Sequence, residues 1–176
     1  MRILNLNYDL LLICGVDCAG KSTLINLLEE TLNFEVVKGS SFELSQCTQD
    51  ELFKRFKEMT KKKRTIFDRF IYCNEVYAPL YEDFAMLTDD ERREIESMIK
   101  DRALLIHLEA DTDVLIQRLN NRGDDYVTSD KLQSSIAKDD TLKSETYLYS
   151  ADMKEYGDIK DKVIMSPSEP AVEDTE

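Results

Sequence analysis

Eight residues that begin at Gly15 have the types and the spacing needed to bind phosphate. The segment reads Gly15-Val-Asp-Cys-Ala-Gly-Lys-Ser22, which fits the pattern G-x-x-x-x-G-K-S/T without a mismatch. Its two glycines allow backbone N–H groups to turn inward around phosphate oxygens. The lysine can bridge terminal phosphates, and the serine hydroxyl can ligate Mg²⁺. We therefore expect ATP to be bound by Gly15, Asp17, Cys18, Ala19, Gly20, Lys21, Ser22 and Thr23.

A second group of polar residues follows the apolar run that ends at Phe67. Asp68 and Arg69 come directly after it, and Asn74 and Tyr77 follow a few residues later. If the run is a parallel strand, its carboxyl end lies at the edge of the sheet where ligands bind. We expect Asp68 to face Mg²⁺, directly or through water, and Arg69 to contact a second phosphate. The alternative is a plain ion pair at a strand end.

Short apolar runs alternate with longer helical patterns, and this alternation would position both groups. The expected strands are Asp9–Cys14, Glu35–Lys38, Arg64–Phe67, Ala103–Leu108 and Lys162–Met165. Helices are expected to begin at Ser22, Thr48, Thr88, Thr112 and about Asp130, and the last of these is expected to continue into the Tyr147–Met153 region. The second and third have capping-box spacing to Glu51 and Glu91. The alternation predicts an α/β fold of the P-loop NTPase type, with a five-stranded, mostly parallel sheet flanked by helices in three layers.

The composition narrows the classes of partner. The chain has 176 residues, which suits one domain, and 36 acidic against 23 basic residues give a net charge of -13. Such a charge opposes binding to nucleic acid and to anionic membranes. No apolar stretch approaches the roughly 18 residues of a membrane span, and no signal-peptide pattern is present. We expect a cytoplasmic protein whose partners are small-molecule nucleotides.

Two large classes of phosphate-loop protein are disfavoured. The guanine signature of GTPases, Asn/Thr-Lys-x-Asp, follows neither Leu108 nor Met165, and no apolar run ends in the Asp-Glu of ATPase motors. The chain instead resembles the thymidylate kinases, within the nucleoside monophosphate and deoxynucleoside kinases. The likeness rests on the phosphate loop with its aspartate, on Asp68-Arg69-Phe70 with the helix after it, and on Gln117-Arg118-Leu-Asn-Asn-Arg122, which is similar to the family's arginine-bearing lid.

The resemblance implies a role for each matching residue. Asp17 would hold the 3′-hydroxyl of the acceptor nucleotide, and Arg69 would clamp the acceptor phosphate. Asn74 would face the base, and Tyr77 would lie under the sugar, where its ring excludes a 2′-hydroxyl. The lid would supply the remaining cations, because the loop carries Cys18 and Ala19 instead of a basic residue. The implied catalytic residues are Lys21, Asp68, Arg69, Arg118 and Arg122.

The acceptor side departs from the family pattern. The family's Arg-x-Pro-Gly stretch is replaced by Val37-Lys38-Gly39-Ser40, and the acceptor segment before the third strand is abbreviated. We expect Lys38 to replace the missing arginine and Phe53 to stack on the base. The alternative is that Phe53 and Phe56, which have helical spacing, both belong to the core.

The resemblance implies Mg-ATP-dependent phosphoryl transfer to a deoxynucleoside monophosphate, with dTMP or a modified pyrimidine analogue first. It implies one kinase domain over residues 1–165 with a lid at about residues 118–128, and it allows a homodimer. The acidic segment 166–176 is expected to be a disordered tail. Three alternatives stay open: a deoxynucleoside kinase that acts on a 5′-hydroxyl, a kinase of a modified base in DNA, and a nucleotide-binding regulator without turnover.

Overall fold

The computed structural model describes residues 8–39, 46–81, 84–123, 127–145, 154–156 and 162–167. For residues 140–145, 154–156 and 162–167 it describes the backbone alone. Within these ranges, no helix is both long enough and apolar enough to cross a membrane.

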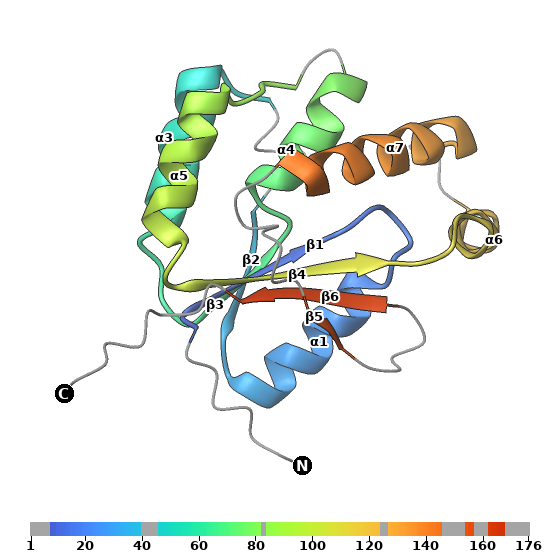
Figure 1. Ribbon diagram of the computed structural model, residues 1–176, viewed down its shortest axis with the longest axis horizontal. Helices are drawn as coiled ribbons and strands as arrows, with labels where there is room; N and C mark the ends of the chain where they lie inside the picture. The colour runs from blue at the N-terminus through green and yellow to red at the C-terminus, as the bar shows by residue number, and fades with distance from the viewer. Residues whose placement is uncertain are drawn as a thin grey trace.

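A six-stranded sheet forms the middle of the molecule (Figure 1). Its strand order is β2 (Glu35–Lys38), β3 (Thr65–Asp68), β1 (Leu10–Cys14), β4 (Ala103–Glu109), β6 (Lys162–Pro167) and β5 (Lys154–Tyr156). The first four run parallel to their neighbours, and β6 pairs antiparallel with both β4 and β5. The predicted α/β fold with a mostly parallel sheet is confirmed, and β5 is a strand that the sequence patterns did not predict.

Helices cover both faces of the sheet (Figure 1). Residues of α3 (Gln49–Met59), α4 (Ile71–Tyr77) and α5 (Asp89–Ile99) pack on one face, where a 3-10 turn, η1 (Ala78–Leu80), follows α4. Residues of α1 (Lys21–Leu32) and α6 (Thr112–Arg122) pack on the other. The last described helix, α7 (Ser129–Glu145), contacts both α4 and α6. The layers therefore match the predicted arrangement.

The central strand β1 shows why the sheet must be covered on both sides. All of its side chains are apolar and buried. Leu10 and Leu12 belong to the core cluster on the α3–α5 face, whereas Leu11 and Ile13 belong to the cluster on the α1–α6 face. Alternate side chains of a strand point to opposite faces, so a continuous apolar run predicts a strand buried on both faces.

Both predicted capping boxes are present. Thr48 Oγ1 accepts a hydrogen bond from the backbone N–H of Glu51, whose carboxylate accepts one from the N–H of Thr48. Thr88 and Glu91 make the same pair of bonds at the start of α5. The two helices lie side by side, and a hydrogen bond between Gln49 and Glu91 joins their first turns (Figure 1).

Several element boundaries differ from the expected ones. The N-cap of α6 is Asp111 and not Thr112, which is already helical. β3 runs to Asp68, one residue beyond its expected end, while β6 runs to Pro167, two residues into the expected tail. Residues 168–176 and the expected continuation of α7 over 147–153 lie outside the described residues.

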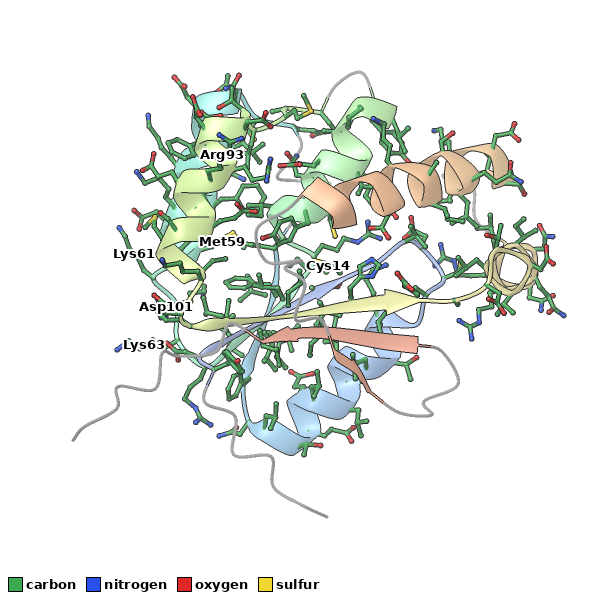
Figure 2. The ribbon with its side chains drawn as sticks, viewed as in Figure 1. Cys14, Met59, Lys61, Lys63, Arg93 and Asp101 are labelled. Carbon is green, nitrogen blue, oxygen red and sulfur yellow. The ribbon has the colours of Figure 1, made fainter. Side chains whose placement is uncertain are left out.

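The residues at the two ends of the parallel strands differ in their exposure to solvent. Lys61, Lys63 and Asp101 lie exposed near the amino ends of β3 and β4, whereas Cys14 lies in the interior at the carboxyl end of β1 (Figure 2). Also at this carboxyl end, His107 of β4 is buried, and its Nε2 lies 2.7 Å from Oδ2 of Asp139 on α7. The contact ties α7 to the sheet.

Replacing Thr88 by alanine should lower the free energy of unfolding by about 1 kcal/mol, because the backbone N–H of Glu91 loses its acceptor. Replacing Thr88 by serine should retain most of the stability, because the hydroxyl is kept. Urea unfolding of both variants measures the difference, and equal losses would contradict a role for the cap.

Candidate active site

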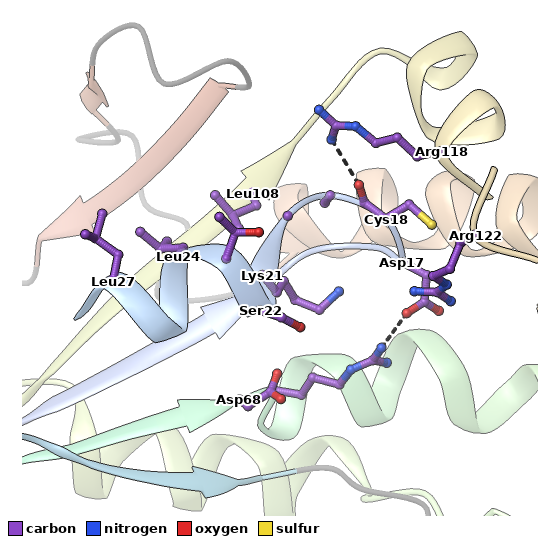
Figure 3. A pocket seen from close by; sticks show the side chains of 14 residues that line it. Asp17, Cys18, Lys21, Ser22, Leu24, Leu27, Asp68, Leu108, Arg118 and Arg122 are labelled. Carbon is purple, nitrogen blue, oxygen red and sulfur yellow. Dashed lines mark hydrogen bonds and ion pairs between the residues drawn. The ribbon is translucent and has the colours of Figure 1, made fainter. Parts of the chain in front are cut away.

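The segment after β1 forms one wall of a cavity of about 720 Å³ (Figure 3). Residues 17–24, from the loop and the first turn of α1, line this wall. Asp68 at the end of β3, Arg69 directly after it, and Arg118 and Arg122 of α6 line it from other directions. Because β3, β1 and β4 are parallel neighbours, the segments that follow them meet at one edge of the sheet.

The phosphate loop begins at Gly15, where its backbone lies close to the backbone of β4. Gly15 has a φ of +126°, and a Cβ added to it would lie 2.4 Å from the carbonyl oxygen of Leu108. A side chain at this position would therefore be strained and would collide with β4 backbone. The glycine predicted for a phosphate loop is required here by the close approach of the two segments.

Lys21 lies at the centre of the loop. Its side chain is buried, and its ammonium donates hydrogen bonds to the carbonyl oxygens of Gly15 at 2.9 Å and Val16 at 2.8 Å. Burial lowers the pKa of this ammonium, and the nearby charge of Arg69 lowers it further. A group that loses hydration on burial gains most from a new anionic partner, and phosphate is one.

Asp17 joins the loop to the segment after β3. Its Oδ1 accepts a hydrogen bond from the guanidinium of Arg69 at 2.5 Å, and its Oδ2 accepts one from the hydroxyl of Tyr77 at 3.0 Å. The backbone N–H of Asp17 donates to the same hydroxyl oxygen at 3.1 Å. The guanidinium also lies 4.8 Å from the centre of the Tyr77 ring, a cation–π distance. We call these three residues the acidic-loop cluster.

The charges of the acidic-loop cluster are fixed near neutral pH. Burial alone would raise the pKa of Asp17, but the charges of Arg69 and Lys21 outweigh it and hold the pKa below its ordinary value. Burial and the charge of Asp17 raise the pKa of Tyr77 well above its ordinary value, so the phenol stays neutral. The arrangement is suited to binding and aligning anions, and Asp17 is not basic enough to remove a proton.

The backbone of Arg69 is unusual. Its φ is +68°, in the left-handed region that non-glycine residues rarely occupy, and its N–H donates to the carbonyl oxygen of Ile13 at 3.1 Å. This conformation turns the chain from β3 into α4 while the guanidinium reaches back to the loop. A left-handed conformation at a non-glycine residue persists only where the surrounding structure enforces it.

Ser22 and Asp68 offer oxygen ligands of the kind that Mg²⁺ prefers. Both line the same cavity, one at the start of α1 and the other at the end of β3 (Figure 3). Among the described residues, no group of three or more His, Cys, Asp or Glu side chains could hold a metal ion by itself. Mg²⁺ commonly takes one or two protein ligands together with phosphate oxygens and water, so one hydroxyl and one carboxylate would be enough protein ligands.

The arginines predicted for the lid lie on α6. Nη1 of Arg118 donates to the carbonyl oxygen of Cys18 at 3.0 Å, and Arg122 lines the cavity one turn further along the helix (Figure 3). The structure therefore brings Lys21, Asp68, Arg69 and both α6 arginines to one cavity.

Comparison with known proteins gives one strong match by sequence. The chain is 38% identical over 127 residues to the SPbeta prophage-derived uncharacterized protein YorR of Bacillus subtilis (strain 168), which covers 72% of this chain and 77% of YorR. The chain belongs to the YorR family. No protein-family model matches it.

A solved structure agrees with membership of the YorR family. A crystal structure of Bacillus subtilis YorR in complex with phosphorylated GDP matches with a TM-score of 0.74 and 36% identity, over 78% of this chain and 81% of that one. Deoxyadenosine kinase from M. mycoides with bound dCTP matches with a TM-score of 0.45 and 18% identity, over 77% of this chain and 83% of that one. This similarity is too distant to bear on function. The YorR structure supports the α/β fold described above, and it does not single out the thymidylate kinases.

Four residues expected on the acceptor side do not line the cavity of this YorR-family chain: Asn74, Phe53, Lys38 and Tyr77, although the hydroxyl of Tyr77 contacts Asp17, which does line it. Asn74 is buried, and its amide donates to the carbonyl oxygen of Ala85 at 2.9 Å and accepts from the N–H of Leu87, so it braces α4 instead of facing a base. Phe53 packs against the core cluster beside α3, as the alternative interpretation had it. Lys38 is exposed at the end of β2, in register with Asp68.

Sequence reasoning missed the apolar part of the cavity. Leu24 and Leu27 of α1 and Leu108 of β4 line it, and Leu27 is 57% exposed. The available signal was the position of each residue: Leu108 ends an apolar strand at the carboxyl edge of the sheet, and Leu24 follows the phosphate loop by one residue. Apolar walls of this kind commonly contact the flat face of a ligand.

The left-handed backbone at position 69 gives a stability prediction. Arg69→Gly and Arg69→Ala both remove the guanidinium, but glycine adopts a φ of +68° without the cost of a Cβ. Arg69→Gly should therefore be the more stable variant by about 1 kcal/mol. Urea unfolding of the two proteins provides the comparison, and an alanine variant as stable as the glycine variant would contradict the strain.

Proposed function

We propose that this YorR-family protein is a kinase that transfers a phosphoryl group from Mg-ATP to a deoxynucleoside monophosphate. The observation that carries the proposal is the acidic-loop cluster, which holds a second cationic group, Arg69, beside the cavity that contains Lys21. Transfer to a nucleotide places a second phosphate beside the first, and Arg69 is positioned next to the phosphate loop to neutralise it.

The donor side of the mechanism follows from the phosphate loop. Backbone N–H groups at the start of α1 face the phosphates of the donor, and Lys21 exchanges its carbonyl partners for their oxygens. Ser22 and Asp68 would hold Mg²⁺, which when bound neutralises charge on the donor phosphates. Arg118 and Arg122 approach the transferred group from α6, and such cations stabilise the charge that develops in the transition state.

The acceptor side follows from the acidic-loop cluster. Arg69 presents a planar guanidinium that can engage two oxygens of the acceptor phosphate. Asp17 is ionised, so it can accept a hydrogen bond from a sugar hydroxyl, and Tyr77 holds it in place. The acceptor phosphate oxygen is already ionised at neutral pH, so the attack requires alignment and charge neutralisation but no general base.

The residues that line the cavity do not select one particular base for the acceptor nucleotide. The residues expected to select thymine, Asn74, Phe53 and Lys38, lie outside the cavity lining, so the geometry gives thymine no advantage. The Bacillus subtilis relative was crystallised with phosphorylated GDP. This supports a nucleotide ligand and places guanine nucleotides beside dTMP in any substrate panel.

A deoxynucleoside kinase is the second candidate. It would transfer to a 5′-hydroxyl, whose proton requires an acceptor, and Asp68 lines the cavity with a carboxylate suited to that task. A panel of nucleosides and nucleoside monophosphates, each assayed for ADP formation from Mg-ATP, separates the two candidates. A protein that binds ATP but acts on no member of the panel would be a regulator.

The variant Lys21→Ala should abolish most of the transfer. Its ammonium is proposed to neutralise the moving phosphoryl group, so kcat should fall by roughly 10²- to 10³-fold. Among the residues that the structure describes, the partners of the Lys21 ammonium are backbone carbonyls of its own loop, so the circular dichroism spectrum should be unchanged. A folded variant with near-normal kcat would remove the catalytic role of the loop.

Tyr77 gives a prediction on the sugar. Its ring is proposed to exclude a 2′-hydroxyl, so deoxyribonucleotides should be favoured roughly ten- to a hundredfold in kcat/KM. Tyr77→Phe should keep this ratio but raise KM for both sugars, because Asp17 loses two contacts with the hydroxyl. Tyr77→Ala should lose the ratio. Assays with pairs such as dGMP and GMP test this, and an unchanged ratio in Tyr77→Ala would make Tyr77 a packing residue.

A further inference from the structure

The end of β2 lies against the backbone of Arg69. The N–H of Gly39 donates to the carbonyl oxygen of Asp68 at 3.0 Å. A Cβ added to Gly39 would lie 1.9 Å from the carbonyl oxygen of Arg69 and 3.2 Å from Cα of Phe70. Gly39 is buried and is not among the glycines with positive φ, so the missing side chain serves the close approach and not an unusual dihedral angle.

Arg69 is also held from the opposite side. Its N–H donates to the carbonyl oxygen of Ile13 in β1, while its carbonyl oxygen packs on Gly39 beyond β2. The left-handed backbone of this residue is thus fixed between two strands that flank β3. Its side chain extends to Asp17 and lies over the ring of Tyr77.

We propose that Gly39 is a positioning residue for Arg69, because its missing side chain lets β2 hold the Arg69 backbone in the conformation that aims the guanidinium at the cavity. Gly39 itself contacts no reacting atom. The kinetic part of this inference rests on the proposed function, in which Arg69 binds the acceptor phosphate.

The test compares Gly39→Ala with a control at the opposite end of the same strand. Asn33 precedes β2, has a φ of +53°, and does not itself line the cavity, whose nearest lining residue along the sequence is Leu27. Asn33→Ala therefore perturbs the entry into β2 without touching Arg69. For the nucleotide that the panel identifies, Gly39→Ala should lower kcat/KM for the acceptor roughly ten- to hundredfold, since a small misplacement of a positioning group has effects of that size. The Kd for ATP should change less than twofold in both variants.

A double variant separates positioning from general damage. If Gly39 acts through Arg69, adding Gly39→Ala to Arg69→Gly should change kcat/KM less than twofold, because the guanidinium is already gone. Independent losses that multiply would overturn the proposal. Should Gly39→Ala alone fail to fold, the flexible backbone of Arg69→Gly should restore folding, and a double variant that stays unfolded would also overturn it.

A spectroscopic readout keeps this inference separate from the proposed function. The side-chain Nε–H signal of Arg69 in ¹⁵N-labelled protein can be assigned by its loss in Arg69→Gly. It should shift or broaden in Gly39→Ala and stay unchanged in Asn33→Ala. An unchanged signal in Gly39→Ala would refute the positioning role. A changed signal in a protein whose wild type phosphorylates no nucleotide would refute the proposed function alone.

Discussion

The ion pair between Asp17 and Arg69 connects the segment after β1 with the segment after β3, and the cavity depends on that connection. Its existence follows from strand order. Because β1 lies between β3 and β4 and runs parallel to both, three segments reach the same edge of the sheet. The close packing of Gly15 on Leu108 and of Gly39 on Arg69 brings their backbones together there. Backbone contact, more than any single side chain, therefore sets the geometry of the charged groups.

The cations of the site are held by oxygens of the protein itself. Lys21 bonds to two loop carbonyls, Arg69 to Asp17 and Arg118 to the carbonyl of Cys18. These bonds hold the cations in place in a chain whose net charge is -13. For Lys21 and Arg118, phosphate binding is then an exchange in which neutral carbonyl partners are replaced by anionic oxygens, which attract the two cations more strongly. The favourable free energy of phosphate binding from these groups is therefore only the difference between the two sets of bonds.

The phosphate loop and the fold could be predicted because their signals are local. A strand, a glycine-rich turn and a helix follow one another in the sequence, and the capping boxes at Thr48 and Thr88 mark helix starts within four residues. The acceptor side could not be predicted in the same way. Asn74 and Phe53 were given roles by position in a motif, yet the neighbours that decide their contacts, Ala85 and the core beside α3, are distant in sequence. The role proposed for Gly39 could not be predicted from the sequence for the same reason. A glycine after a strand indicates only a turn until its neighbour in space is known.

The buried contact between His107 and Asp139 bears on conformational specificity. Exchanging a buried polar pair for apolar residues of similar volume is often neutral for stability, whereas separating such partners leaves a buried group uncompensated and costs several kcal/mol. The pair therefore adds little to the free energy of folding but penalises every other placement of α7 on the sheet. Together with the bond from Arg118 to the loop, it means that α6 contacts the phosphate loop and α7 contacts the carboxyl end of β4 through defined polar partners.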